Sequence, residues 1–205
     1  MKISFSTLGC PDWSWRDILI TAKDLKYDGI EVRGVEKEIY VPHAKPFLKE
    51  NIENTKKELL ERGLEIPCIT SSCFLHDKDR DRYLAEGKEY IDLAAELSTP
   101  YVRVLGDKNP EPSSSVNKKQ IAEMLRELGD YAKSTHVKVL IETNGVFADS
   151  KVMIELMDMV GSSNVGVLWD IHHPYRFFNE AVCETYGRLK DFIKHIHIKD
   201  SYIEN

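Results

Sequence analysis

Hydrophobic residues recur along this chain with two alternating periods. Short apolar runs with the two-residue period of strands are separated by longer segments whose apolar positions recur every three to four residues, as in amphipathic helices. The expected strands span residues 2–7, 29–33, 65–72, 101–106, 137–144, 165–170 and 193–199. The expected helices span residues 14–25, 45–62, 79–97, 117–134, 150–160 and 179–190. This alternation predicts βαβ units, and therefore a parallel sheet with helices on its faces.

Residues at the ends of these segments support the assignment. Ser14 can cap the first helix through its hydroxyl oxygen, with Asp17 three residues on. Gly63 and Gly161 follow the last apolar positions of two other helices, where glycine commonly ends a helix in the left-handed conformation. We therefore expect helix boundaries close to these residues.

Two closures of a seven-stranded parallel sheet are consistent with the pattern. An open, doubly wound sheet predicts a glycine-rich phosphate loop after the first strand, but the segment 7–12 contains one glycine. A TIM-type barrel predicts polar residues at the carboxyl ends of several strands, because its active sites form there. Such residues are Glu31, Arg103, Glu142, Asp170 and His197. We therefore predict an α/β fold of the (β/α) TIM-barrel type, a single domain over residues 1–205 with seven strands visible.

The composition narrows the classes of function. The 205 residues are 42% hydrophobic and 30% charged, and no apolar run of about 18 residues could cross a membrane. The amino terminus lacks the features of a signal peptide, so we expect a cytoplasmic protein. The four cysteines form no C-x-x-C pair and are expected to be free thiols. A net charge of −6 argues against nucleic acid as the main partner.

One acidic residue, Glu142, ends an apolar strand. Side chains alternate along a strand, so Leu140, Glu142 and Asn144 share one face. A buried carboxylate is costly unless it is paired, hydrogen-bonded or bound to a metal ion. Two interpretations are open: a structural ion pair with Arg103 on the neighbouring strand, or a catalytic carboxylate whose pKa is raised by its site.

The strand at 165–170 ends in an acid that is followed by two histidines. His173 lies three residues after Asp170 and immediately before Pro174, where strand geometry fails, so its ring can fold back toward Asp170. His172 points elsewhere and is expected to be a loop or packing residue. The Asp-x-x-His pattern alone is weak evidence for a functional site. It becomes informative only together with polar residues at the ends of neighbouring strands.

The last strand has two different faces. One face carries His195, His197 and Lys199. The other carries Ile196 and Ile198 and is expected to face the covering helices. A face with two imidazoles and an ammonium group is not that of an ordinary core. We expect His197, nearest the carboxyl end, to be the better metal ligand, and His195 to orient a neighbouring group by hydrogen bonding.

Glu142, Asp170 and His197 therefore reach the same end of three successive strands. Two carboxylates and one imidazole form an open, oxygen-rich site for a divalent cation. This ligand set suits Mn²⁺ first, with Mg²⁺, Co²⁺ and Zn²⁺ as alternatives. His173 would lie beside the ion and face a substrate.

Four motifs together resemble a known superfamily. They are DGIEVRG at 28–34, VLIETNG at 139–145, VGVLWDIHHPY at 165–175 and HIHIKD at 195–200. The chain resembles, over essentially its whole length, the xylose-isomerase-like TIM-barrel superfamily of sugar and sugar-phosphate isomerases and epimerases. The motifs are fairly specific for the superfamily but say little about the substrate.

The resemblance implies a role for each of the matching residues. Glu142, Asp170 and His197 would hold the metal, and Glu142 would also act as acid or base. The residues expected to bind substrate are His173, Glu31, Arg103, His76 and Lys199. Of these, His76 and Lys199 are included for their positions, His76 in the loop after the third strand and Lys199 on the polar face of the last strand. His76 could equally belong to an ordinary surface loop.

The expected function is metal-dependent isomerisation or epimerisation of a small sugar, sugar phosphate or related hydroxy-ketone through an enediolate. An inosose-type dehydratase uses the same proton removal and stays open as an alternative. An endonuclease IV-like DNA-repair enzyme needs more histidines and acids on the second to fourth strands. A barrel that binds a metabolite without catalysis is the last alternative.

Members of the superfamily usually carry a second glutamate on an eighth strand. Here the sequence ends a few residues past the seventh strand, and Glu204 is the only acid in the last five residues. We therefore expect the eighth strand to be absent, the metal to have three protein ligands, and the open edge to favour a homodimer or aggregation. The segment 106–115 is long, polar and proline-bearing, so we expect either a mobile lid or an unstructured loop.

Overall fold

Seven parallel strands form the frame of the molecule. The computed structural model describes residues 1–113 and 115–201. The strands are β1 (Ser4–Ser6), β2 (Gly29–Glu31), β3 (Cys68–Phe74), β4 (Tyr101–Leu105), β5 (Lys138–Glu142), β6 (Val165–Asp170) and β7 (Ile193–His197). β1 pairs with β2, and β3 to β7 pair in chain order. Bridges from Gly29 to Glu65 and from Val32 to Ile69 connect the two sheets, so strands that are neighbours in sequence are neighbours in space.

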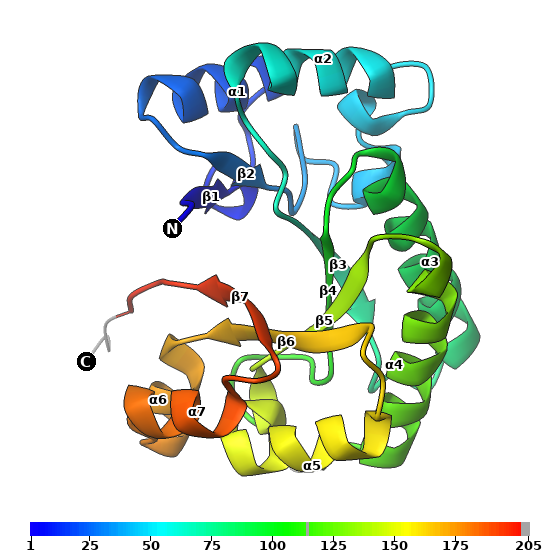
Figure 1. Cartoon of the computed structure of the whole chain (residues 1–205), viewed down its shortest axis with the longest axis vertical. Helices are drawn as coiled ribbons and strands as arrows, with labels where there is room; N and C mark the ends of the chain where they lie inside the picture. The colour runs from blue at the N-terminus through cyan, green and yellow to red at the C-terminus, as the bar shows by residue number, and fades with distance from the viewer. Residues whose placement is uncertain (114, 202–205) are drawn as a thin grey trace.

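The helices lie on the outside of the curved sheet (Figure 1). They are α1 (Trp15–Asp24), α2 (Ile52–Arg62), α3 (Arg80–Glu96), α4 (Lys118–Tyr131), α5 (Ser150–Val160), α6 (His172–Phe178) and α7 (Val182–Leu189). Short 3₁₀ helices occupy Thr7–Gly9, Val41–His43, Lys45–Phe47, Ala132–Ser134 and Gly145–Ala148. Parallel strands with helices on their outer face confirm the predicted α/β TIM-barrel-like fold.

The buried apolar residues form two clusters, one on the outer face of the strands and one on the inner face. The large outer cluster lies between strands and helices and includes Val139, Ile141 and Val167. The alternate residues of the same strands, Leu140 and Leu168, form a small inner cluster with Cys68. This division follows from the two-residue alternation of strand side chains, and it leaves the next inward positions toward the carboxyl ends for polar residues.

The helix ends agree with the capping pattern in part. Ser14 Oγ accepts a hydrogen bond from Asp17 N at 3.2 Å, and Gly63 and Gly161 end α2 and α5 with φ of 66° and 58°. The helix expected from residue 45, however, begins only at Ile52. The residues Lys45–Phe47 form a short 3₁₀ helix instead. The backbone at Leu48 is extended, with ψ of 147°, and this interrupts the helical path before α2.

The segment after β6 was predicted wrongly. Residues after Asp170 continue directly into α6, whereas we expected a loop there and one helix from 179 to 190. Pro174 lies in the first turn of α6, where its missing N–H costs nothing. Asn179, with φ of 51°, ends α6, and α7 therefore starts only at Val182.

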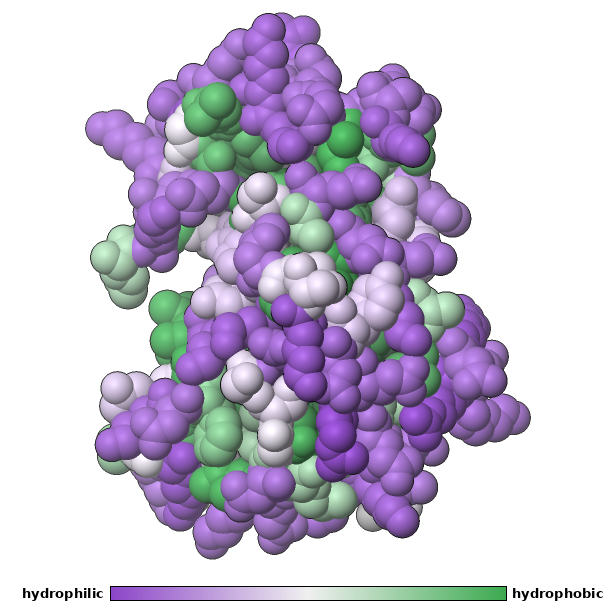
Figure 2. All heavy atoms as spheres, turned by 45° about the vertical axis from the view of Figure 1, so that its right-hand side comes forward, coloured by the Kyte–Doolittle hydropathy of each residue, from purple (hydrophilic) through white to green (hydrophobic). Residues whose placement is uncertain are grey.

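The surface seen over α3 and α4 is mainly hydrophilic, with small hydrophobic patches (Figure 2). No helix in the described part of the chain is long and apolar enough to cross a membrane. All four cysteines are free thiols, as predicted.

Ile196 of β7 and Ile198, which follows the strand, are 44% and 81% exposed. The expectation that they face helices is wrong, because no described helix covers that side of β7.

Candidate active site

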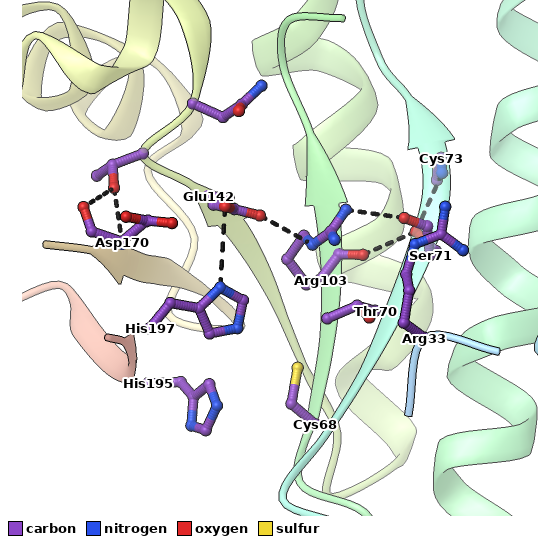
Figure 3. A network of polar contacts seen from close by, with 12 residues as sticks. Arg33, Cys68, Thr70, Ser71, Cys73, Arg103, Glu142, Asp170, His195 and His197 are labelled. Carbon is purple, nitrogen blue, oxygen red and sulfur yellow. Dashed lines mark hydrogen bonds and ion pairs between the residues drawn. The ribbon is translucent and has the colours of Figure 1, made fainter. Parts of the chain in front are cut away.

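Most of the predicted polar residues line one cavity of about 420 Å³ at the carboxyl ends of the strands. Glu142 ends β5, Asp170 ends β6 and His197 ends β7, and their side chains point toward a common centre (Figure 3). In the β6–β7 ladder Asp170 and His197 are direct register partners. The alternation that places Leu140 and Leu168 in the inner core therefore directs these polar groups to the cavity one layer above.

Glu142 is buried and surrounded by cationic or polar groups. Arg103 Nε lies 3.0 Å from Glu142 Oε2, which confirms the ion pair suggested by the sequence, although the pair is poorly aligned for a hydrogen bond. His197 Nδ1 and His173 Nδ1 lie 3.8 and 4.0 Å from Glu142 Oε1. Burial alone would raise the pKa of Glu142, but Arg103 and the two histidines lower it to about 2. The expected rise in pKa is therefore wrong, and Glu142 is ionised at neutral pH.

Asp170 and His173 form a second part of the site. His173 Nε2 lies 3.6 Å from Asp170 Oδ2, so the ring folds back as predicted. His173 Nδ1 lies 2.8 Å from the carbonyl oxygen of Thr143. A carbonyl oxygen only accepts, so Nδ1 carries the proton and the Nε2 lone pair faces Lys199. Burial lowers the pKa of His173, which favours this neutral form.

Lys199 joins these two residues. Its Nζ lies 2.8 Å from Asp170 Oδ2 and 2.5 Å from His173 Nε2. Lys199 therefore points to the polar face that the alternation predicted. Because one cation contacts both atoms, Asp170 and His173 present their lone pairs to a shared position.

Glu31 connects β2 to β7. Its carboxylate oxygens lie 2.8 Å from His195 Nε2 and 2.8 Å from His197 Nε2. Burial would raise the pKa of Glu31, but the two histidines lower it to about 2. Burial would lower the pKa of His197, but Glu142 and Glu31 raise it to about 9. His195 thus hydrogen-bonds a neighbour, as expected, and Glu31 contacts both rings.

The donors fit a divalent cation. Glu142, Asp170 and His173 offer ligand atoms that all lie within 4.8 Å of one another, and Glu31, His195 and His197 form a second such group. Carboxylate and imidazole donors suit Mn²⁺, Mg²⁺, Co²⁺ or Zn²⁺. The ammonium of Lys199 beside Asp170 and His173 marks a position that favours positive charge. The expected set of Glu142, Asp170 and His197 draws on both groups.

Other predicted residues lie elsewhere. His76 packs against Phe74, with ring centroids 5.7 Å apart, and does not line the cavity. His172 is half-buried, and its Nε2 contacts Ser201 Oγ at 2.6 Å, consistent with a packing role. Glu204 lies outside the described residues.

The sequence reasoning missed one charged residue of the cavity wall. Arg33 lines the cavity, and its Nη2 donates to Ser72 Oγ at 2.7 Å. It lies two residues after Glu31, so strand alternation places both side chains on the same face. That parity was the signal that could have identified it.

The chain belongs to the xylose isomerase-like TIM barrel family, whose model matches residues 19–205. The family includes sugar epimerases and dehydratases, and the two groups of donors are candidate metal sites. No curated protein sequence is significantly similar to this chain.

Solved structures share the fold at low sequence identity. The probable 3-DHS dehydratase AsbF of Bacillus anthracis is 21% identical, with a TM-score of 0.82 over 98% of this chain and 73% of that one. A xylose isomerase-like TIM barrel protein of Mycobacterium smegmatis in complex with magnesium is 18% identical, with a TM-score of 0.77 over 97% and 74%. D-allulose 3-epimerase of Methylomonas sp. in complex with D-allulose is 17% identical, with a TM-score of 0.74 over 96% and 71%.

Proposed function

We propose that this chain is a divalent-metal-dependent isomerase or epimerase of a small sugar, sugar phosphate or related hydroxy-ketone. The observation that carries the proposal is the ionised carboxylate of Glu142, buried in the cavity wall beside Arg103, His173 and His197. A buried anion held among cations and possible ligands is in the protonation state that proton removal next to a carbonyl group requires, although a pKa of about 2 makes it a weak base. The similar structures in complex with magnesium and with D-allulose support a divalent cation and a sugar substrate.

Glu142, Asp170 and His197 would hold the ion, with His173 beside them. When bound, the ion would supply positive charge next to the substrate oxygens, where negative charge develops as the proton leaves. Mn²⁺ is our first choice, and Mg²⁺, Co²⁺ and Zn²⁺ are alternatives.

Four other groups would bind and orient the substrate. The proposed contacts are Glu31, Arg103, His173 and Lys199. Glu142, ionised at neutral pH, would accept the proton, and the Arg103 ion pair would hold its carboxylate in place. Lys199 Nζ and the neutral His173 ring can donate to and accept from hydroxyl groups. His76 is not among these contacts, because its ring packs against Phe74 and does not line the cavity.

Solvent exchange of substrate protons tests this function directly. A panel of ketoses in deuterated water is followed by NMR with each of the four ions. We expect Glu142→Gln to reduce the exchange rate by at least about a hundredfold, the low end of what general base catalysis contributes, without loss of fold. Glu96→Gln, on an exposed position of α3, is the matched control.

The products distinguish the alternatives. Loss of water from the substrate would identify a dehydratase, and cleavage of DNA containing an abasic site would identify the nuclease. Ligand binding with no exchange of any proton would identify a barrel that binds without catalysis. Exchange at the wild-type rate in Glu142→Gln would sink the proposed role of Glu142.

A further inference from the structure

The charged groups that line the cavity pair almost completely. Glu142 is paired with Arg103 at 3.0 Å, Asp170 with Lys199 at 2.8 Å, and Glu31 with His197 at 2.8 Å. Each carboxylate in the cavity wall therefore already has a cation. Arg33 is the cation left over, because no carboxylate oxygen of the described residues lies within 4.0 Å of its guanidinium.

The guanidinium of Arg33 is fixed in place by neutral groups. Nη2 donates to Ser72 Oγ at 2.7 Å and Nη1 to the carbonyl oxygen of Ile39 at 3.4 Å. Arg103 Nη1 donates to the carbonyl oxygen of Ser71 at 2.8 Å (Figure 3). Adjacent residues of β3 therefore hold the two guanidinium groups. Burial and the charge of Arg103 both lower the pKa of Arg33, which means that the folded protein disfavours this positive charge.

One carboxylate, that of Glu86, acts on Arg33 through its charge. Its charge favours the charged form of Arg33, but the two groups are not within ion-pair distance, and burial raises the pKa of Glu86. Glu86 also lies outside the cavity lining. It therefore does not fill the place of an anion on the cavity side of Arg33.

We propose that Arg33 binds an anionic group of the substrate, a carboxylate or a phosphate, at the β2–β3 side of the cavity. A guanidinium presents a planar fork of donors that matches either group. A divalent cation in the same cavity would increase the positive charge further and favour an anionic ligand. The cavity of about 420 Å³ has room for a six-carbon acid or sugar phosphate. This inference rests on the proposed function, because it names the class of sugar substrate.

Three probes on one carbon skeleton test the anion site. D-glucose is neutral, D-glucuronate carries a carboxylate and D-glucose 6-phosphate carries a phosphate. Each is titrated into the whole chain at constant ionic strength, with and without Mn²⁺. Calorimetry gives the affinity, and the Nε–Hε resonance of Arg33 reports contact at the site itself.

We expect at least one anion to shift the Arg33 resonance and to bind at least about tenfold more tightly than glucose. Arg33→Met should remove this preference. Arg16→Met, on an exposed position of α1, makes the same change in net charge and should keep it. Arg33→Lys retains the positive charge but lacks the planar fork of donors, so it should keep part of the preference. It replaces Arg33→Met in the test if Arg33→Met fails to fold.

The comparison of the two anions identifies the group. Tighter binding of glucuronate indicates a carboxylate site, and tighter binding of glucose 6-phosphate indicates a phosphate site. The proposal is overturned if neither anion shifts the Arg33 resonance, if glucose binds as tightly as both anions, or if Arg33→Met keeps the preference. Anion binding without proton exchange would reject the proposed isomerase alone, and exchange on neutral ketoses without anion preference would reject the anion site alone.

Discussion

Glu142 illustrates how charge can outweigh burial at a single residue. Burial alone favours a protonated carboxyl group, but Arg103 at 3.0 Å and two histidines within 4.0 Å reverse that preference. Glu142 therefore enters the reaction without its proton, as the accepting step requires, although the same neighbours weaken it as a base. A donor for any later step has to come from another group, because Glu142 has no proton to give at neutral pH.

At the residue scale, the Mn²⁺ affinity of single variants distinguishes the proposed metal ligands from adjacent residues. We expect Asp170→Asn and His197→Ala each to weaken Mn²⁺ binding by more than about tenfold, because each removes a charged or nitrogen donor. His172→Ala should leave the affinity unchanged, since its ring contacts Ser201 and not the cavity. Calorimetric titration of Mn²⁺ measures all three. A loss in His173→Ala with no loss in His197→Ala would assign the site to Glu142, Asp170 and His173.

Strand alternation explains why part of the site was predictable. Glu142, Asp170 and His197 end apolar strands, and the side-chain period of two fixes their direction. Contacts that cross the cavity were not predictable in the same way. The approach of Glu31 to His195 and His197 depends on the curvature of the whole sheet, which local pattern does not encode.

At the scale of elements, the buried carboxylate of Asp107 connects the loop between β4 and α4 to the segment that follows β5. The carboxylate of Asp107 accepts hydrogen bonds from the hydroxyl and N–H of Ser113 and from the N–H of Val146 at 3.0 Å. Gly145 has φ of 56°, and a Cβ there would lie 2.3 Å from Asp107 Oδ2, so the close approach requires glycine. The described part of this loop is therefore held against the start of the 3₁₀ helix after β5, contrary to the expectation of an unstructured loop.

The pH dependence of stability should report this attachment. Burial would raise the pKa of Asp107, but the hydrogen bonds lower it below its ordinary value. The ionised form therefore stabilises the fold above the unfolded pKa of about 3.9, and this contribution is lost as pH falls through the lower folded value. We expect Asp107→Asn to cost about 1–3 kcal/mol at neutral pH and to make unfolding less sensitive to acid.

Urea unfolding at a series of pH values measures both effects. Asp158→Asn, on an exposed position of α5, is the matched control and should show neither. An Asp107→Asn chain with wild-type stability and wild-type acid sensitivity would contradict the role of Asp107.

The elements themselves were predicted better than their ends. All seven strands and six of the helices follow from apolar period, and Gly63 and Gly161 marked two helix ends. The missed helix, α6, is short and begins with two histidines and Pro174, which look like the end of a strand. Its apolar residues are too few to show a helical period, so packing after Asp170 decides its conformation.

At the scale of the whole molecule, β1 and β7 are the end strands among the described residues. Ile3 near β1 is 54% exposed, and Ile196 and Ile198 at β7 are exposed as well. Unpaired strand edges with exposed apolar side chains favour association. We expect the chain to form dimers or larger species, and Ile198→Lys to weaken that association without loss of fold.

Sedimentation velocity over a range of concentrations measures the association. Ile20→Lys, at an exposed apolar position of α1, is the control for added charge and should leave it unchanged. A chain that stays monomeric throughout, or equal effects of both substitutions, would show that the end strands are not the contact.

The strands differ in how many neighbouring strands they hydrogen-bond to, and this difference sets the order in which their backbone hydrogen bonds break and expose the amides to solvent. β4 and β5 have a strand on each side, whereas β1 is bonded to β2 over three positions, Ser4 to Ser6. Amide hydrogens of β1 should therefore exchange with deuterium much faster than those of Val102 to Val104. Because β2, next to β1, carries Glu31 and leads into Arg33, local opening can detach one wall of the cavity while the wall with Glu142 stays folded. A ligand that touches both walls would slow exchange in β1 and β2, and leave the rates in β4 unchanged.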